Sequence, residues 1–421
     1  MPPVTRREFI TASAASLAIL SSGDLLGLSS VSSSTDAGKP WYSTVRRCGQ
    51  LNFNESDPLT VDIDAWMDYW VSLKVNAVMI GGGGIVASYP TNVPYHHRSQ
   101  YLGSRDLTGE AIAAARKRNL RVIVRMDCNY AYQDALKAHP EWFHRMPDGS
   151  PRLELEASYL YKTCLFSSYF TEQMPAIYRE LQQRYSPDAI FTNGWPGTAA
   201  LEVCHCVNCK KIYQEQTGGV PPATTNAKSP VYRKYYKVYM DRIIEIWKLW
   251  DSTAKEKNPE AIYFGDLGGA GLQMMKDLKP IGDIASWYAG DHQGRGGANV
   301  PIWECAAQGR IAQSVMGGKT VTNIDGAYSD SQPKWRHVSA PAAEINLWMA
   351  QVAACGMVPW HHWLGARPKI TAGASLQKTF MGGLRRMRSI SAIVSRCLRL
   401  LYFIPRAPSL FIVRKGQAKE S

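Results

Sequence analysis

The chain has 421 residues, of which 45% are hydrophobic and 10% aromatic, enough for a sizeable folded core. Its net charge is +13, but twelve Lys or Arg residues and one acid lie from Arg367 onward, so the preceding 366 residues carry only +2. Because a nucleic-acid-binding domain spreads its basic residues over a folded face, this distribution argues against nucleic acid as a partner. No run of about 18 apolar residues follows the leader, so we expect no transmembrane helix.

The N-terminus has the pattern of an export signal. Thr5 to Ile10 reads TRREFI, and a weakly hydrophobic stretch rich in Ala and Ser follows it up to about Leu28. Paired arginines before a modest apolar segment are typical of the twin-arginine route, which carries folded proteins. We therefore expect residues 1–37 to be a signal and linker and the mature protein to be periplasmic or extracellular. A chance Arg-Arg pair in a disordered N-terminus is the alternative.

Strand and helix patterns alternate from Trp41 onward. Eight apolar runs predict strands: Val45–Phe53, Ala77–Ile80, Arg121–Met126, Ala189–Thr192, Ile262–Gly265, Ile284–Tyr288, Thr320–Ile324 and Met357–Trp360. Helical periodicity separates most of them: Ile63–Leu73, Gly109–Arg118, Glu172–Arg184, Val231–Lys255 and Ala340–Ala354. Strands that are apolar throughout and alternate with helices indicate a parallel sheet covered on both faces. Eight such units predict an α/β (β/α)8 TIM barrel over residues 42–366. A doubly wound sheet is the alternative, but no G-x-G-x-x-G opens a helix.

The C-terminal segment, residues 367–421, differs abruptly in composition from the barrel. Basic residues separate short apolar groups in this segment, as in LRLLYFIP and SLFIVRK. This basic tail fits the last barrel helix, over about residues 375–400, a basic amphipathic helix at a membrane surface, or an aberrant sequence out of its ancestral register. We assign it no function.

Acidic residues follow several of the predicted strands. In a (β/α)8 barrel the reactive groups sit at the C-terminal ends of the strands. Asp127, Asp266 and Asp325 end strands three, five and seven, so we expect them to project toward one mouth. Asp291 lies in the Gly-rich segment YAGDHQGRGG, and Glu304 opens the next predicted helix, where it could equally serve the helix dipole. These five acids are the catalytic candidates, since a carboxylate pair performs glycoside hydrolysis.

Aromatic, imidazole and amide side chains accompany these acids. Rings such as Trp287 and Trp360 offer flat apolar faces for sugar C–H surfaces, and polar neighbours offer hydrogen bonds to hydroxyls. Any one of these residues is more often structural, and only their joint occurrence at strand ends points to a sugar site. The candidate substrate-binding residues are Asn54, His96, His97, Asn129, Tyr130, Asn193, Trp195, Tyr288, His292, His361, His362 and Trp363.

Three of the nine cysteines lie within six residues, as C-x-C-x-x-C at Cys204, Cys206 and Cys209. Cys164 is the best candidate for a fourth ligand, because structural zinc takes four ligands. Thiolates of this kind favour zinc, so we expect a closed structural zinc site and no organic cofactor. A buried cluster of free thiols, or one disulfide with a spare thiol, is the alternative.

The order of these motifs resembles family 42 β-galactosidases, whose barrel holds a structural zinc on four cysteines. Several stretches more closely resemble a hypothetical glycosyl hydrolase group of the TIM-barrel superfamily, distantly related to those enzymes and to α-L-fucosidases. They are YPTNVPYHHRS, AHPEWFHRMPDGSP, CHCVNC, PIWECAAQGRIAQSV and PAAEINLWMAQVAACGMVPWHHWLG. The resemblance spans about residues 42–366 and assigns the zinc ligands to Cys164, Cys204, Cys206 and Cys209.

The resemblance carries over less well to catalysis. Family 42 enzymes end strand four with Asn-Glu, and fucosidase-like barrels place an Asp nucleophile there, whereas this chain has Asn193-Gly194. An amide can neither act as the acid nor form the glycosyl ester. Relatives of the group often continue into a trimerisation domain, so a homo-oligomer stays open for this chain.

Three functions fit the sequence. The first is an exported glycoside hydrolase with a structural zinc, whose carboxylates come from strands other than strand four. The second is a non-catalytic carbohydrate-binding barrel that has lost the strand-four carboxylate. The third, a metal-dependent hydrolase, is weakened because no H-x-H motif ends strand one.

Overall fold

The computed structural model describes residues 38–154, 157–193, 202–226, 228–266, 278–293, 302–326, 328–329, 335–339 and 341–364. The predicted signal (1–37) and tail (367–421) therefore lie outside the described residues. The central sheet has eight strands: β1 (Cys48–Asn52), β2 (Ala77–Gly83), β5 (Arg121–Asp127), β8 (Ala189–Asn193), β9 (Ile262–Gly265), β10 (Trp287–Asp291), β11 (Thr320–Gly326) and β14 (Val358–Leu364).

These strands form a parallel barrel. Their order is β10-β11-β14-β1-β2-β5-β8-β9, and all neighbours in it pair in parallel. The two edge strands, β9 and β10, are joined by a parallel bridge between Asp266 and Ala289. This arrangement confirms the predicted (β/α)8 TIM-barrel fold. Each predicted strand is present, although β10 starts at Trp287 because Ile284 ends the helix before it.

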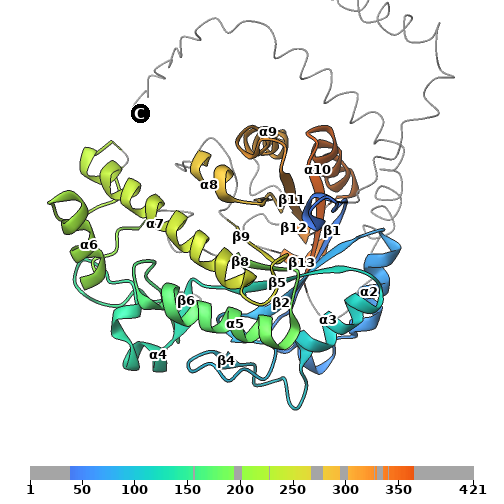
Figure 1. The fold of residues 1–421 in the computed structure, drawn as a ribbon, viewed down its shortest axis with the longest axis horizontal. Helices are drawn as coiled ribbons and strands as arrows, with labels where there is room; N and C mark the ends of the chain where they lie inside the picture. The colour runs from blue at the N-terminus through green and yellow to red at the C-terminus, as the bar shows by residue number, and fades with distance from the viewer. Residues whose placement is uncertain are drawn as a thin grey trace, which may run out of the picture. The chain divides into compact units, whose positions relative to one another are not determined.

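Helices surround the strands (Figure 1). They are α2 (Ile63–Ser72), α3 (Leu107–Lys117), α4 (Gln133–Ala138), α5 (Met174–Tyr185), α6 (Val207–Thr217), α7 (Pro230–Lys255), α8 (Lys279–Ile284), α9 (Glu304–Met316) and α10 (Ala342–Ala354). Small two-stranded sheets decorate the loops: β3 (Val86–Ala87) with β4 (His97–Arg98), β6 (Tyr130–Tyr132) with β7 (Leu160–Lys162), and β12 (Tyr328–Ser329) with β13 (Trp335–Ser339). None of the helices in the described ranges is long and apolar enough to cross a bilayer.

Local sequence explains where the helices start. Asp62, Asp106 and Ser229 precede α2, α3 and α7, and each side chain accepts a hydrogen bond from a backbone N–H in the first helical turn. Such N-caps satisfy donors that the helix itself leaves unpaired. On α2, the buried Trp66 and Trp70 lie one turn apart and face the sheet. Capping and apolar periodicity therefore agree, as expected of a well-specified element.

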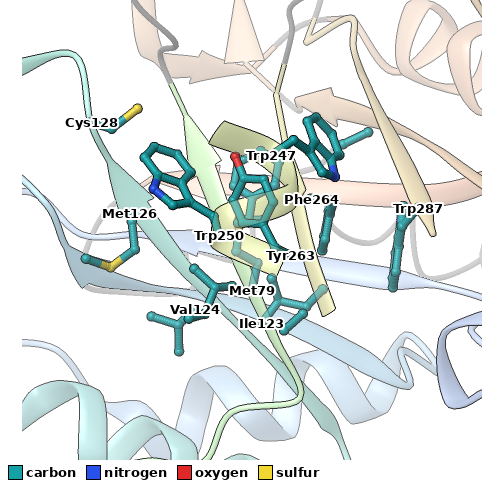
Figure 2. Close-up of a cluster of buried hydrophobic side chains, with 14 of the residues drawn as sticks. Met79, Ile123, Val124, Met126, Cys128, Trp247, Trp250, Tyr263, Phe264 and Trp287 are labelled. Carbon is teal, nitrogen blue, oxygen red and sulfur yellow. The ribbon is translucent and has the colours of Figure 1, made fainter. Parts of the chain in front are cut away.

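The two faces of each strand pack against different layers. Phe191 of β8 and Phe264 of β9 contact Trp360 of β14 at ring distances of 5.9 and 6.1 Å, although these strands are not neighbours. These rings therefore fill the barrel lumen, where Phe264 also stacks on Trp287 (Figure 2). Tyr263 points the opposite way, onto two tryptophans of α7 (Figure 2). Because side chains alternate along a strand, these contacts show which residues face the lumen and which face the helices.

Candidate active site and four-cysteine cluster

Four consecutive strands of the barrel wall end in polar side chains that face the lumen. Asp127 of β5 is in register with Asn193 of β8, and both lie two residues beyond the lumen-facing pair Arg125 and Phe191. Asp266 follows β9 and lies two residues after Phe264, so it shares the lumenal face of that ring. Asp291 ends β10 and is in register with Ile324. Ile324 is in turn in register with the lumenal Trp360, which places Asp291 on the lumenal face as well. Three of the predicted catalytic acids therefore line one half of the mouth, together with the amide of strand four.

Asp127 is held by two donors. Its Oδ1 accepts hydrogen bonds from Nη2 of Arg125 at 2.9 Å and from Nδ2 of Asn193 at 3.0 Å. Within the described part of the chain Oδ2 makes no hydrogen bond, and the side chain is 31% exposed. Arg125 is a site residue that sequence reasoning missed. Its signal was present, because a charged residue inside an apolar strand, two positions before Asp127, must share the face of that carboxylate.

The other two lumenal acids lie on neighbouring strands. Asp266 is buried, and its backbone N–H donates to the carbonyl oxygen of Thr192 on β8. Oδ2 of Asp291 accepts a hydrogen bond from Nε2 of Gln293 at 2.9 Å. The Asp266–Ala289 bridge joins their strands, so Asp291 lies two residues beyond the position opposite Asp266, on the same face of the wall.

Amide and imidazole groups line the opposite half of the mouth. Gln50 and Asn52 of β1 are buried, and Nε2 of Gln50 donates to Oδ1 of Asn52 at 2.9 Å. His362 of β14 is in register with Gln50 and is also buried, which places this predicted substrate-binding residue in the lumen. Gln50 was not among the predicted site residues. Amide and imidazole groups on β1 and β14 thus lie across the mouth from the three carboxylates.

Asp325, His361 and Trp363 do not face the lumen, contrary to expectation. The ring of His361 lies 6.0 Å from that of Trp70 on α2, and Trp363 donates to the hydroxyl of Tyr69 on the same helix at 3.1 Å. Asp325 is in register with His361 and therefore shares its helix-facing side. A position at a strand end does not determine whether a side chain faces the lumen or the helices, because successive residues along a strand point to opposite faces.

Burial dominates the environment of Asp325. The side chain is completely buried, and within the described ranges neither carboxylate oxygen has a hydrogen-bond partner. Burial raises the pKa of this carboxyl well above its usual value, and the nearby Glu344 of α10 adds to the effect. Asp325 therefore lies between the barrel strands and the surrounding helices rather than at the mouth.

Tyr288, His292 and Glu304 also lie away from the lumen. Tyr288 alternates with the lumenal Trp287, so it points toward the helices. His292 follows Asp291 on the opposite face, where its ring lies 4.6 Å from that of Trp348 on α10. Glu304, in the first turn of α9, lies 3.4 Å from Nε2 of His292. The predicted sugar-stacking rings of Trp287 and Trp360 are part of the buried core.

The two histidines of the loop after β2 have different surroundings. His96 is buried, and its Nε2 accepts a hydrogen bond from the backbone N–H of Gly84 at 2.9 Å. Burial lowers the pKa of His96 to about 4. His97 is half-exposed, hydrogen-bonds Asp134 at 2.9 Å and stacks on Tyr132 with ring centroids 4.0 Å apart. Both therefore shape the rim of the mouth rather than its floor.

The remaining predicted binding residues are spread along the loops. Asn54 is exposed in the turn after β1. Asn129 and Tyr130 follow β5, where burial and a hydrogen bond to Glu154 raise the pKa of Tyr130. Trp195 and Gly194 lie outside the described residues. None of these loop positions is brought into contact with the lumenal carboxylates by a hydrogen bond among the described residues.

Cys164, Cys204, Cys206 and Cys209 come together as the sequence predicted. All four are buried, and their sulfur atoms lie within 4.8 Å of one another. The Sγ atom of Cys164 is 3.8, 3.5 and 3.4 Å from those of Cys204, Cys206 and Cys209. A zinc ion with Zn–S bonds of about 2.3 Å holds tetrahedral sulfurs about 3.8 Å apart. The donor set and its spacing therefore fit a tetrahedral metal ion.

The cluster ties two loops of the mouth together. Cys164 follows β7 in the long connection after β5, whereas Cys206 and Cys209 begin α6 after β8. Backbone N–H groups of Arg145 and Cys209 donate to sulfur atoms of Cys204 and Cys206, as is common around metal-bound thiolates. The four sulfurs leave no open coordination position, so the cluster has the form of a structural site.

Comparisons with known proteins agree with this architecture. Residues 62–194 match the family model described as Hypothetical glycosyl hydrolase 6. No curated protein matches the chain. The match covers β2, β5 and β8, including Asp127 and Asn193.

Solved structures share the fold at low sequence identity. An α-L-fucosidase, isoenzyme 2 from Paenibacillus thiaminolyticus, has a TM-score of 0.62 and 16% identity over 82% of this chain and 50% of its own. A β-galactosidase from the psychrophilic Marinomonas ef1 has a TM-score of 0.63 and 11% identity over 83% and 61%. A β-galactosidase from Bacillus circulans sp. alkalophilus has a TM-score of 0.61 and 13% identity over 82% of this chain and 56% of its own. The chain thus spans half to three fifths of these proteins.

At such identities the structural similarity establishes the fold alone. The family match adds an independent link to glycosyl hydrolases, over a segment that includes part of the mouth. Together they agree with the resemblance that the motifs predicted: residues 62–194 are similar to a hypothetical glycosyl hydrolase family, and the fold is similar to those of β-galactosidases and an α-L-fucosidase.

Proposed function

We propose that this protein hydrolyses glycosidic bonds of a saccharide with two carboxylates at the C-terminal mouth of the barrel. The observation that carries the proposal is the row of Asp127, Asp266 and Asp291 on the lumenal wall, facing amide and imidazole groups. Glycoside hydrolysis needs one carboxyl group as acid and a second as nucleophile or base. The opposite half of the mouth supplies donors and acceptors suited to sugar hydroxyls.

The surroundings of Asp127 suit the nucleophile or base. The guanidinium of Arg125 and the amide of Asn193 both bind Oδ1, which orients the carboxylate while Oδ2 remains available to a sugar or a water molecule. The acid role then falls to Asp266 or Asp291. Carboxyl groups about 5–5.5 Å apart perform retaining hydrolysis, and a separation of about 6.5–9.5 Å leaves room for the water of an inverting mechanism.

Turnover of a panel of aryl glycosides tests the proposal. Asp127→Asn, Asp266→Asn and Asp291→Asn keep the side-chain shape while removing the carboxylate, and two of the three should abolish hydrolysis. Asp241→Asn, on the exposed face of α7, is the matched control and should retain it. Proton NMR of the first product formed would identify retention or inversion.

A non-catalytic carbohydrate-binding barrel is the second candidate, favoured by the amide at the end of strand four. Asn193 stands where the resemblance to family 42 β-galactosidases predicts a carboxylate, and its amide donates to Asp127. Isothermal titration with neutral oligosaccharides distinguishes the candidates: binding without turnover, unaffected by Asp127→Asn, would favour the lectin. Hydrolysis lost in the same variant would exclude it.

We also propose that the four cysteines hold a structural zinc ion. Four buried sulfurs at tetrahedral spacing support this assignment, and thiolate sets favour zinc. The metal analysis compares wild type with Cys206→Ser, using Cys305→Ser, a buried cysteine outside the cluster, as the control. One zinc per chain, lost only in Cys206→Ser, is expected; equal metal content in all three proteins would remove the assignment.

A further inference from the structure

The strand next to Asp127 contains a bulge made of glycines. Gly81 of β2 is in register with Arg125, but Gly83 is in register with Met126, so Gly82 is an extra residue. Bulges re-aim backbone locally and are frequent beside active sites. Beyond this bulge, Gly84 has a φ of +101°, and a Cβ atom there would lie 1.9 Å from the carbonyl oxygen of Asp127. The backbone of Gly84 therefore packs directly on the peptide of Asp127.

His96 holds Gly84 in this position. A backbone N–H can only donate, so the 2.9 Å hydrogen bond from Gly84 requires an unprotonated Nε2 on His96. The proton of the neutral ring is therefore on Nδ1, which lies 3.1 Å from Oγ1 of Thr91. The Thr91 hydroxyl in turn donates to Oε2 of Glu180 at 2.7 Å. The tautomer of His96 is thus set by partners on both sides of the ring.

Glu180 anchors this chain of hydrogen bonds to the scaffold. It lies on α5 and also accepts from the hydroxyl of Tyr89 at 2.9 Å and from the backbone N–H of Asn92 at 2.7 Å. Burial opposes its charge, but the hydrogen bonds from Thr91, Asn92 and Tyr89 outweigh burial and lower the pKa of Glu180. A charged acceptor fixed on a helix therefore orients Thr91, and through it His96.

We propose that His96 is a positioning residue for Asp127, acting through Gly84. The chain of contacts runs from Glu180 through Thr91 and His96 to a backbone that touches Asp127, rather than ending in the loop itself. The consequence for catalysis rests on the proposed hydrolase function. A displacement of about 1 Å at a reacting group can lower the rate a hundredfold, so a fixed Gly84 keeps the Asp127 carboxylate where the reaction needs it.

Two substitutions at His96 separate positioning from packing. The His96→Gln variant introduces an amide oxygen that can accept the hydrogen bond from the Gly84 N–H. The His96→Leu variant fills similar space but has no hydrogen-bond acceptor. Ser99→Ala is the matched control, because Ser99 is buried in the same loop and its hydroxyl donates to the Glu55 carbonyl oxygen, not to Gly84. All three are made in the full-length chain.

The direct readout is the amide resonance of Asp127 in protein labelled with ¹⁵N-aspartate. It should shift in His96→Leu and stay in place in His96→Gln and Ser99→Ala. On an aryl glycoside that wild type cleaves, His96→Leu should lower kcat about ten- to a hundredfold with KM nearly unchanged, and His96→Gln should restore most of kcat.

An unchanged Asp127 resonance in folded His96→Leu would overturn the proposal, as would an equal shift in Ser99→Ala. Because this readout needs no turnover, it decides the inference even if no aryl glycoside is cleaved, an outcome that would count against the proposed hydrolase alone. If His96→Leu does not fold, His96→Gln and Thr91→Val test the proposal instead. Thr91→Val removes the acceptor of the His96 Nδ1 proton and should also shift the Asp127 resonance.

Discussion

The amide of Asn193 donates to the carboxylate of Asp127 across two neighbouring strands, at 3.0 Å. The resemblance to family 42 β-galactosidases predicts an acid at this strand-four position. Here Asn193 supports the acid of the preceding strand, and Arg125 donates to the same oxygen. The absence of a carboxylate at strand four is therefore compatible with a hydrolytic site centred on Asp127.

The first prediction concerns this pair. Asn193→Ala removes a donor to Asp127 and should lower kcat/KM about ten- to a hundredfold, since a hydrogen bond to a charged group contributes about 1.5–3 kcal/mol. Asn193→Asp should have a larger effect, because a second carboxylate repels the first. Steady-state kinetics on a cleaved aryl glycoside measure both.

Asn92→Ala is the control, because only the backbone of this exposed residue is hydrogen-bonded among the described residues. It should be indistinguishable from wild type. Higher activity of Asn193→Asp than of wild type would instead mean that strand four supplies a catalytic acid more readily than Asp127 does.

The buried Asp325 gives a prediction about stability. Its folded-state pKa is raised, so the native state binds the proton more tightly than the unfolded state, and stability falls as pH rises above about 4. Asp325→Asn removes this titration and should raise the free energy of unfolding by about 1–3 kcal/mol at pH 8. The gain should disappear near pH 3.5.

Urea denaturation at several pH values measures the effect, with Asp241→Asn as an exposed control. A gain that is the same at pH 3.5 and pH 8 would show that the titration of Asp325 is not its source.

His96 gives the opposite pH dependence. Burial lowers its pKa from 6.5 to about 4, so the unfolded state binds the proton more tightly. The contribution to stability is complete above pH 6.5 and is lost as pH falls toward 4. At about 1.4 kcal/mol per pKa unit, wild type should lose about 2–3 kcal/mol from this group between pH 7.5 and 4.5.

His96→Gln cannot titrate and should lose correspondingly less stability over that range. Chemical denaturation of both proteins at the two pH values provides the comparison. Parallel losses in wild type and variant would assign the pH dependence to other groups, such as the buried His144.

Export through the twin-arginine route stays a prediction from Arg6 and Arg7. Replacing both by Lys should keep the precursor in the cytoplasm, because this route is recognised by the arginine pair. Cell fractionation of an epitope-tagged chain measures the effect, with Arg46→Lys as the control. Unchanged export of the double variant would point to another route.

The fold was largely predictable from the sequence because each barrel strand is an apolar run flanked by helical periodicity. The cysteine cluster was predictable too, because three of its ligands share six residues and the fourth is a lone cysteine upstream.

The face of each strand-end residue was not predictable. Asp127 and Asp325 look alike in sequence, yet one faces the lumen and the other the helices, because the register of neighbouring strands decides the face. The burial of Trp360 was not predictable either, because only tertiary contacts decide whether a ring packs in the core or is exposed to stack on a sugar. Gln50 was missed because it lies inside a buried strand, where the sequence does not distinguish a lumenal amide from a core residue.

Hydrolysis by the lumenal carboxylates is tested most directly by single-turnover and steady-state assays of wild type and Asp127→Asn on a panel of aryl glycosides. Wild type should release the aryl alcohol from at least one glycoside, and Asp127→Asn should do so at least a thousandfold more slowly while still binding the substrate, since removing an essential catalytic carboxylate costs about 4 kcal/mol or more. Equal rates for the two proteins would contradict the account.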